Sequence, residues 1–253
     1  MPSKYRYGKE TDWKPWKHVR YCCDVISFLL IEIFFINILN THQIKPQQIA
    51  AFSVCSVVPS CDYTIRHMVS LYFKCEFFSL KAGVKTGLNI TCKNPSEVGA
   101  DRIANAIAAV HAFPQKNLLI IDMGTATTLC AVTNKQDYLG GAILPGMRLG
   151  MESLKTNTAK LMEVDIEMPA AYLGRNTREN IQSGLYYGHL GALKELITGI
   201  KQEVFKEESV LIIGTGGFSQ LFKDKNLFDV IMPDLVLQGL HKAYEFSQQL
   251  NKT

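Results

Sequence analysis

The sequence predicts an α/β fold of alternating strands and helices, and three observations support this. Short continuous apolar runs, typical of strands buried on both faces, recur along the chain, as at residues 118–121 and 129–132. Segments with the apolar spacing of helices separate these runs. Turns rich in glycine join them, and no repeat or low-complexity tract interrupts the alternation. Elements that alternate in this way pack as layers around a sheet.

The composition is that of a globular protein that acts on a small molecule. The chain has 253 residues, enough for one large domain or two smaller ones. Hydrophobic residues make up 47% and charged residues 20%, which excludes a disordered chain. A dispersed net charge of +4 does not favour nucleic acid. The seven cysteines form no C-x-x-C pair, so we expect reduced, mostly buried thiols and a cytoplasmic location.

Residues 1–39 are the least regular part of the chain. Residues 1–20 are basic and aromatic, and residues 21–39 are apolar but interrupted by Asp24, Glu32 and Asn37. A membrane helix is disfavoured, because each acid would cost about 2.5–3.5 kcal/mol near a bilayer centre. A secretory signal is disfavoured because no small-residue cleavage site follows. We therefore expect no membrane partner, and a soluble segment that is buried or poorly ordered.

From residue 40 onward the expected elements follow one another regularly. A connector leads to a strand at 50–58, which Pro59 ends, and to a helix at 63–73. An Ala-rich helix at 97–113 precedes the two central strands, and a strand, a turn with Pro and Gly, and a helix follow at 138–154. A long amphipathic helix at 179–203, a strand before Gly214 and a final helix at 234–250 complete the chain.

The central segment LLIIDMGTATTLCAV, residues 118–132, has the pattern of a hairpin that binds phosphate. Gly124 can adopt backbone angles closed to other residues, so an anion can approach the chain there, beside the hydroxyls of three threonines. Asp122, at the end of the first strand, would face the same pocket and could hold a cation. A hairpin with an ordinary polar turn is the alternative. Gly-Thr-Gly-Gly at 214–217, between a strand and an expected helix start, is a second anion-binding pattern.

Several separated motifs together resemble the type III pantothenate kinases of the actin-like sugar-kinase superfamily. Across residues 48–245, in the family's order, stand SVCSVVPS, GVKTGLNI, NPSEVGADRIANA, IDMGTATT, YLGGAILPGMRLG, LKTNTAKL, GRNTRENIQSG and GTGG. The resemblance implies two duplicated actin-like (ribonuclease H-like) domains around a cleft, here 40–115 and 116–253, and a cytoplasmic homodimer. It also implies transfer of the ATP γ-phosphate to pantothenate, which gives 4′-phosphopantothenate in the first step of coenzyme A biosynthesis.

The resemblance also assigns substrate-binding residues. Asp101 is implied as the base that accepts the proton of the pantothenate hydroxyl, and Arg102 as a ligand of the substrate anion. Gly99 and Ala100 would let the substrate approach the backbone, and Thr177 would contact pantothenate across the dimer interface. From the residues alone, an Asp-Arg pair at a helix start is more often a cap and a surface charge, and an Asn-Thr pair before a helix is an N-cap.

For nucleotide and ions, the resemblance points to the central hairpin. Thr125 is implied in ATP contact, and Asp122 in holding a monovalent cation, ammonium or potassium. A divalent cation such as magnesium would arrive with ATP. His111 and His189 lie in expected helices with no paired carboxylate or cysteine, so we expect both to be structural.

The chain departs from the family in two places. The family's first strand and D-x-G-N-[TS] phosphate loop are not found in residues 1–39, where neither Asp12 nor Asp24 is followed by a glycine turn. We therefore expect a divergent N-terminal segment and a first domain that is incomplete there. Cys92 stands where the family has a tyrosine against the substrate. The alternative to a working kinase is a catalytically impaired homologue that acts by binding or regulation.

Overall fold

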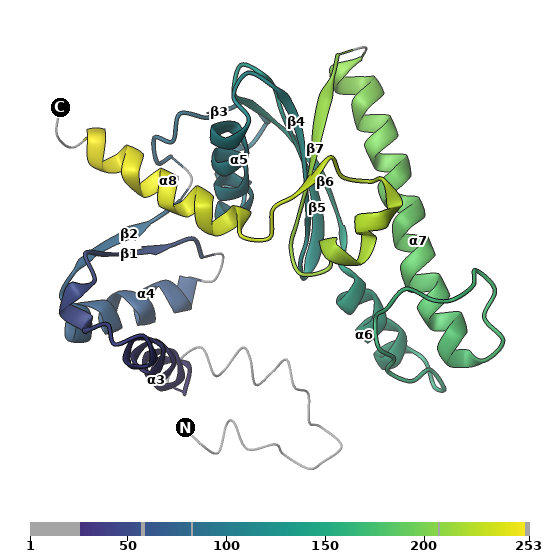
Figure 1. Cartoon of the computed structure of the whole chain (residues 1–253), viewed down its shortest axis with the longest axis horizontal. Helices are drawn as coiled ribbons and strands as arrows, with labels where there is room; N and C mark the ends of the chain where they lie inside the picture. Colours follow the sequence, from purple (N-terminus) through teal and green to yellow (C-terminus); the bar gives the residue numbers. More distant parts are fainter. Residues whose placement is uncertain (1–25, 57–58, 82, 207, 251–253) are drawn as a thin grey trace. The chain divides into compact units, whose positions relative to one another are not determined.

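The computed structural model describes residues 26–56, 59–81, 83–206 and 208–250. Strands and helices are mixed throughout, which confirms the expected α/β class (Figure 1). The chain divides into two compact units, residues 1–81 and residues 82–253. Asp12 and Asp24, on which the sequence comparison of the N-terminus depended, lie outside the described residues.

The first unit pairs two parallel strands with two helices. In chain order it contains α3 (Ile26–Thr41), a short 3₁₀ helix (Pro46–Gln48), β1 (Ala51–Val54), α4 (Pro59–Met68), a π-helical turn (Val69–Phe73) and β2 (Glu76–Ser79). Its core contains the buried side chains of Met68 and Phe73, against which Phe35 of α3 packs. The expected helix at 63–73 is therefore confirmed, with its start moved to Pro59. Among the described helices, none has the length and apolar character needed to span a bilayer.

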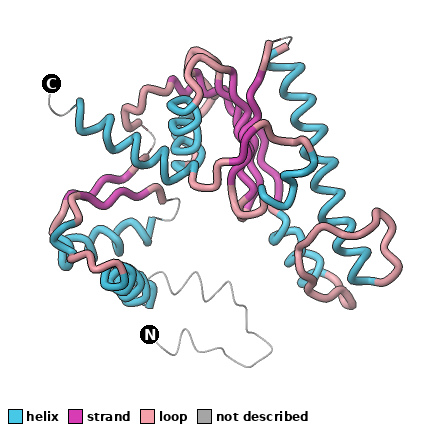
Figure 2. The backbone as a smooth tube through the Cα atoms, in the orientation of Figure 1, coloured by secondary structure: helices cyan, strands magenta, loops and turns pink. Residues whose placement is uncertain are grey.

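The second unit contains a six-stranded sheet in the order β3-β6-β5-β4-β7-β8 (Figure 2). The strands are β3 (Asn89–Ile90), β4 (Asn117–Met123), β5 (Ala126–Val132), β6 (Asp137–Pro145), β7 (Val210–Thr215) and β8 (Val230–Ile231). β4, β5 and β6 form an antiparallel meander, and β7 lies parallel to β4 on its other side. The hairpin expected at 118–132 is confirmed, with Asp122 opposite Thr128 on β5 and Thr215 on β7.

Helices cover both faces of this sheet (Figure 1). α5 (Ala100–Ala112) and α8 (Leu235–Leu250) pack on each other on one side, and α6 (Met147–Asn157) and α7 (Thr177–Ile200) lie on the other. Leu119, Ile121 and Met123 of β4 join the hydrophobic core that α7 covers. Because successive strand residues point to opposite faces, Asp122 points to the α5 side.

α5 and α8 both belong to the unit that begins at residue 82, and the domain division expected at residues 115–116 stays a prediction. The structure differs from the sequence-based expectations in two respects. The segment after Gly-Thr-Gly-Gly is a seven-residue 3₁₀ helix, η6 (Ser219–Lys225), and not the start of an α-helix. Of the cysteines whose burial is described, only Cys130 is buried, and Cys55, Cys75 and Cys92 are half-buried.

Candidate functional site

The Gly-Thr-Gly-Gly turn lies directly against the acidic residue of the central hairpin. Gly216 has a φ of +83°, and a Cβ there would lie 2.5 Å from Oδ1 of Asp122. The backbone N–H of Phe218 donates to the carbonyl oxygen of Met123 at 3.2 Å, which ties the two turns together. Position 216 therefore requires glycine both for its backbone angles and for the room that the carboxylate occupies.

Gly146, which joins β6 to α6, packs on the other side of the hairpin loop. The backbone N–H of Gly146 donates to the carbonyl oxygen of Thr125 at 3.1 Å, and a Cβ at position 146 would overlap that oxygen. Thr125 is exposed at the tip of the hairpin. Three glycine-containing turns, from separate parts of the sequence, thus meet at one end of the sheet.

Thr127, two residues further, is buried and contacts α7. Its Oγ1 lies 3.1 Å from Nε2 of His189, and burial lowers the pKa of that imidazole. His189 was expected to be structural from the sequence. The structure explains this structural role, because the hydrogen bond between His189 and Thr127 joins α7 to β5.

The residues Gly-Ala-Asp-Arg form the first turn of α5. Gly99 is the N-cap, and the buried Ala100 begins the helix. Asp101 is half-buried, and its Oδ1 accepts the backbone N–H of Arg102 at 2.8 Å. A Cβ at Gly99 would overlap this carboxylate oxygen, which explains the glycine. The guanidinium of Arg102 donates from Nη2 to the carbonyl oxygen of Glu97 at 3.3 Å.

Asp122 shares its surroundings with α5. Nδ2 of Asn105 donates to Oδ2 of Asp122 at 2.8 Å. Burial raises the pKa of Asp122; the Asn105 hydrogen bond acts in the opposite direction, and the charge of Asp101 raises the pKa further. The helix and the strand therefore bring these two carboxylates into one electrostatic environment. Sequence reasoning missed Asn105, although its position one turn after Asp101 places both on one helix face.

Beside Arg102 lies a group of weakly acidic side chains. The hydroxyl of Tyr138 donates to Sγ of the buried Cys130 at 3.2 Å. Burial raises the pKa of both groups, and the positive charge of Arg102 lowers both. Cys92 is half-buried and borders this group, with its Cβ 4.0 Å from where a Cβ of Gly140 would lie. Tyr138 on β6, which was not recognised from the sequence, thus lies near Cys92, the position where the family has a tyrosine.

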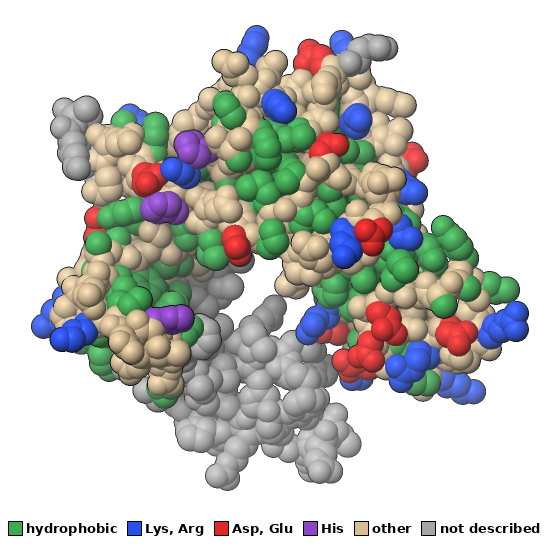
Figure 3. Space-filling view, in the orientation of Figure 1, with side chains coloured by type: hydrophobic (Ala, Val, Ile, Leu, Met, Phe, Trp, Pro, Cys, Tyr) green, Lys and Arg blue, Asp and Glu red, His purple; other side chains and the backbone are tan. Residues whose placement is uncertain are grey.

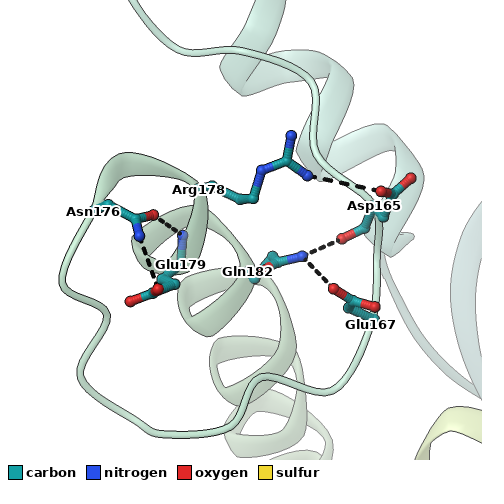
Figure 4. Close-up of polar contacts among 6 residues, drawn as sticks. All are labelled: Asp165, Glu167, Asn176, Arg178, Glu179 and Gln182. Carbon is teal, nitrogen blue, oxygen red and sulfur yellow. Dashed lines mark hydrogen bonds and ion pairs between the residues drawn. The ribbon is translucent and has the colours of Figure 1, made fainter.

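Thr177 is the exposed first residue of α7, at a capped helix start. The side chain of Asn176 accepts the backbone N–H of Glu179 at 3.0 Å and donates to its carboxylate at 2.8 Å (Figure 4). Gln182 donates to the carbonyl oxygen of Asp165 at 3.0 Å and to the carboxylate of Glu167 at 2.9 Å, which holds the preceding loop on the helix.

The structure therefore brings most, but not all, of the expected site residues together. The charge of Asp101 acts on Asp122, and Arg102 lies nearer to Cys130 and Tyr138. The hairpin loop with Thr125 lies at the same end of β4 as Asp122. Thr177 belongs to α7, which covers the opposite face of the sheet from α5 (Figure 1). Within one chain, the sheet stands between α7 and the helix that carries Asp101.

The oxygen donors at Asp122 fit a hard cation. Oδ1 lies between the glycine backbones of two turns, with a Cβ position at Gly124 3.5 Å away and no side chain at either glycine. In the described residues there is no group of three or more His, Cys, Asp or Glu side chains that could hold a metal. A cation here would take its ligands from this carboxylate together with backbone and substrate oxygens, as potassium or magnesium can.

Comparison with solved structures finds a similarity to a Baf family transcriptional activator from Campylobacter jejuni. The sequences are 21% identical, the match covers 68% of this chain and 74% of that chain, and the TM-score is 0.48.

Sequence comparison gives much closer relatives. The type III pantothenate kinase of Legionella pneumophila (strain Corby) is 54% identical over 213 residues, which is 84% of this chain and 83% of the relative. Type III pantothenate kinase 1 of Francisella tularensis subsp. holarctica (strain OSU18) is 43% identical over 218 residues, 86% of this chain and 85% of the relative. The family model for type III pantothenate kinase matches residues 31–199. The chain therefore belongs to the type III pantothenate kinase family.

Proposed function

We propose that this protein transfers the γ-phosphate of ATP to pantothenate, giving 4′-phosphopantothenate for coenzyme A biosynthesis. Its relatives are named for that reaction. The observation that carries the proposal is the shared environment of Asp101 and Asp122, formed where the first turn of α5 meets the glycine turns at 124 and 216. In this site Asp101 would accept a proton, and the glycine turns beside Asp122 would bind phosphate.

Asp101 is the proposed general base. Phosphoryl transfer to an alcohol requires that the hydroxyl be held in line and its proton accepted. A half-buried carboxylate in the first turn of a helix can do both, because the adjacent N–H of Arg102 holds it by one oxygen. The guanidinium of Arg102 can attract the carboxylate of pantothenate, while Gly99 and Ala100 present only backbone or a methyl group to the substrate.

Thr125 and the glycine turns form the proposed phosphate end of the site. Glycines at 124 and 216 let phosphate oxygens approach backbone N–H groups, and Thr125 adds a hydroxyl. Asp122 would hold a monovalent cation, ammonium or potassium, whose charge offsets that of the transferring phosphoryl group. Magnesium would bind with the β- and γ-phosphates of ATP.

For the architecture, we propose two actin-like domains, the first diverging in residues 1–39. The antiparallel meander of β4, β5 and β6, extended by parallel β7 and β8, supports a ribonuclease H-like arrangement in the second unit. The parallel β1–β2 pair and its helices would belong to the first domain. The metabolic role supports a cytoplasmic location.

A homodimer is proposed because Thr177 lies on the opposite face of the sheet from α5. Thr177 of one copy would reach pantothenate at Asp101 of another. The loop before Thr177 supports this, because Met168, Tyr172 and Leu173 are 54%, 75% and 81% exposed. Hydrophobic side chains lie among acidic and basic ones over this part of the surface, at the lower right of Figure 3. A second copy would cover them.

Calorimetric titration tests the substrate assignment. Pantothenate should bind the full-length protein, and pantothenol, which has a hydroxyl in place of the carboxylate, should bind at least about tenfold more weakly. Arg102→Ala should weaken pantothenate and leave pantothenol little changed, because only the acid needs the guanidinium. Asp101→Asn should still bind pantothenate. Equal affinity of the parent for both ligands would refute the role of Arg102.

A further inference from the structure

The side chain of Asn105 joins the helix that carries Asp101 to the strand that carries Asp122. Its Nδ2 donates to Oδ2 of Asp122 at 2.8 Å, and the residue is only 2% exposed. Asp101 and Asn105 lie four positions apart in α5, so their side chains share one face of the helix. A single amide therefore links the carboxylate of Asp122 on β4 to the helix that carries Asp101.

The two oxygens of Asp122 have different surroundings. Oδ2 accepts the amide of Asn105, whereas Oδ1 lies against the backbone of Gly216, where a Cβ would be 2.5 Å away. Oδ1 is also 3.5 Å from the Cβ position of Gly124. Because the Asn105 amide holds Oδ2, the carboxylate has a fixed orientation in which Oδ1 points toward the glycine turns. Outer hydrogen bonds of this kind orient metal ligands in proteins.

The chemical type of the donor matters as much as its position. An amide donates a hydrogen bond without cancelling the charge of the carboxylate. Lysine or arginine at position 105 would pair with Asp122 and repel a cation, and an acid would place a third negative charge beside Asp101 and Asp122. Asparagine holds Asp122 and leaves its charge available.

The other end of the same amide has no partner. Oδ1 of Asn105 is buried and accepts no hydrogen bond in the part of the chain that the structure describes. A buried carbonyl oxygen without a donor lowers stability, so packing alone does not explain a polar residue here. We propose that Asn105 is a positioning residue, which fixes the Asp122 carboxylate for a potassium or ammonium ion; this rests on the cation role proposed for Asp122.

The test uses the full-length protein and needs no turnover. The thermal unfolding midpoint is followed as potassium chloride replaces choline chloride at constant ionic strength, which gives the half-saturating potassium concentration. Asn105→Ala should raise that concentration by about 10–100-fold. Alanine is the best helix former, and the neighbouring positions 104 and 106 are already alanine, so the helix should persist. Asn105→Ser is the second variant and should behave alike.

Asn117→Ala is the matched control. Asn117 is also buried, on the same strand as Asp122, and its Nδ2 donates to the carboxylate of Glu208 at 2.5 Å, at the opposite end of β4. Its loss should lower the unfolding midpoint but leave the response to potassium unchanged. An equal loss of response in this control would make the effect one of general stability and overturn the proposal.

The remaining outcomes separate this inference from the proposed reaction. If Asn105→Ala and Asn105→Ser respond to potassium as the parent does, Asn105 does not position Asp122. If the parent itself shows no response, the cation role of Asp122 and the role of Asn105 both fail. A parent that responds to potassium but does not phosphorylate pantothenate would refute the proposed reaction and leave the role of Asn105 standing.

Discussion

At the scale of single residues, the backbone of the candidate site requires glycine at position 216. Gly216 has a φ of +83° and lies against Asp122 Oδ1 and the backbone of Met123. Gly216→Ala should therefore lower the free energy of unfolding by at least about 1–2 kcal/mol, because alanine is strained at that backbone angle even before its Cβ meets the carboxylate. Chemical denaturation measures the change.

The neighbouring glycine is the control for that substitution. A Cβ at Gly217 meets no atom within 4 Å, so Gly217→Ala should leave stability within about 0.5 kcal/mol of the parent. Equal stability of the two variants would show that the contact between the Gly-Thr-Gly-Gly turn and Asp122 is absent in solution.

His189 predicts a pH dependence of stability. Burial lowers the pKa of its imidazole in the folded state. As pH falls below about 6.5, the ordinary pKa of histidine, the unfolded chain therefore takes up this proton before the folded one, and the free energy of unfolding decreases. His189→Gln should make stability less dependent on pH between 7.5 and 5.5, as measured by urea denaturation. His42→Gln, at an exposed position, is the control. If the free energy of unfolding changes with pH equally in His189→Gln and in the parent, the buried state of His189 is contradicted.

The predicted site residues came from motifs and not from contacts. Asp101, Arg102 and Asp122 were predicted because each lies within three positions of a glycine in a motif that resembles the family's. Asn105 and Tyr138 were missed, because their partners are 17 and 8 positions away in the sequence and meet them only after folding. Short motifs report what a backbone turn requires, whereas contacts between distant residues depend on how the strands and helices pack.

Among the elements, α7 offers the clearest test, because its start carries Thr177. Asn176 caps the helix through the backbone N–H of Glu179. Asn176→Ala should cost about 0.5–2 kcal/mol of stability and weaken pantothenate binding by loosening the turn. Asn176→Ser keeps a capping oxygen without placing a second negative charge beside Glu179, and it should remain near the parent. Unchanged denaturation of the alanine variant would contradict the cap.

The expected strands and helices were largely confirmed because their signals are local. Continuous apolar runs gave the hairpin of β4 and β5, and helical spacing gave α5, α7 and α8. The contact between α5 and α8 was not predicted, for a non-local reason. Gly239 of α8 lies so close to α5 that a Cβ there would overlap the carbonyl oxygen of Ala104, and helical periodicity does not reveal which helices meet.

At the scale of the whole molecule, the position of Thr177 predicts self-association. Sedimentation equilibrium at micromolar concentration should give twice the chain mass of 28.4 kDa. Leu173→Arg, at an 81% exposed position, should shift the protein toward monomer and reduce pantothenate binding, because a charge would be buried in the interface. Leu250→Arg, at the end of α8 and 42% exposed, is the control. A monomeric parent with full activity would contradict the dimer.

The central measurement is product formation by the purified full-length protein. With ATP, magnesium and either ammonium or potassium, pantothenate should be converted to 4′-phosphopantothenate with equal release of ADP, both detected by mass spectrometry. Asp101→Asn should fold normally and turn over about 10²–10⁴-fold more slowly, because the proton acceptor is lost. Pantothenate binding without any phosphorylated product would indicate a catalytically impaired homologue, and turnover by Asp101→Asn at the parent rate would show that Asp101 is not the base.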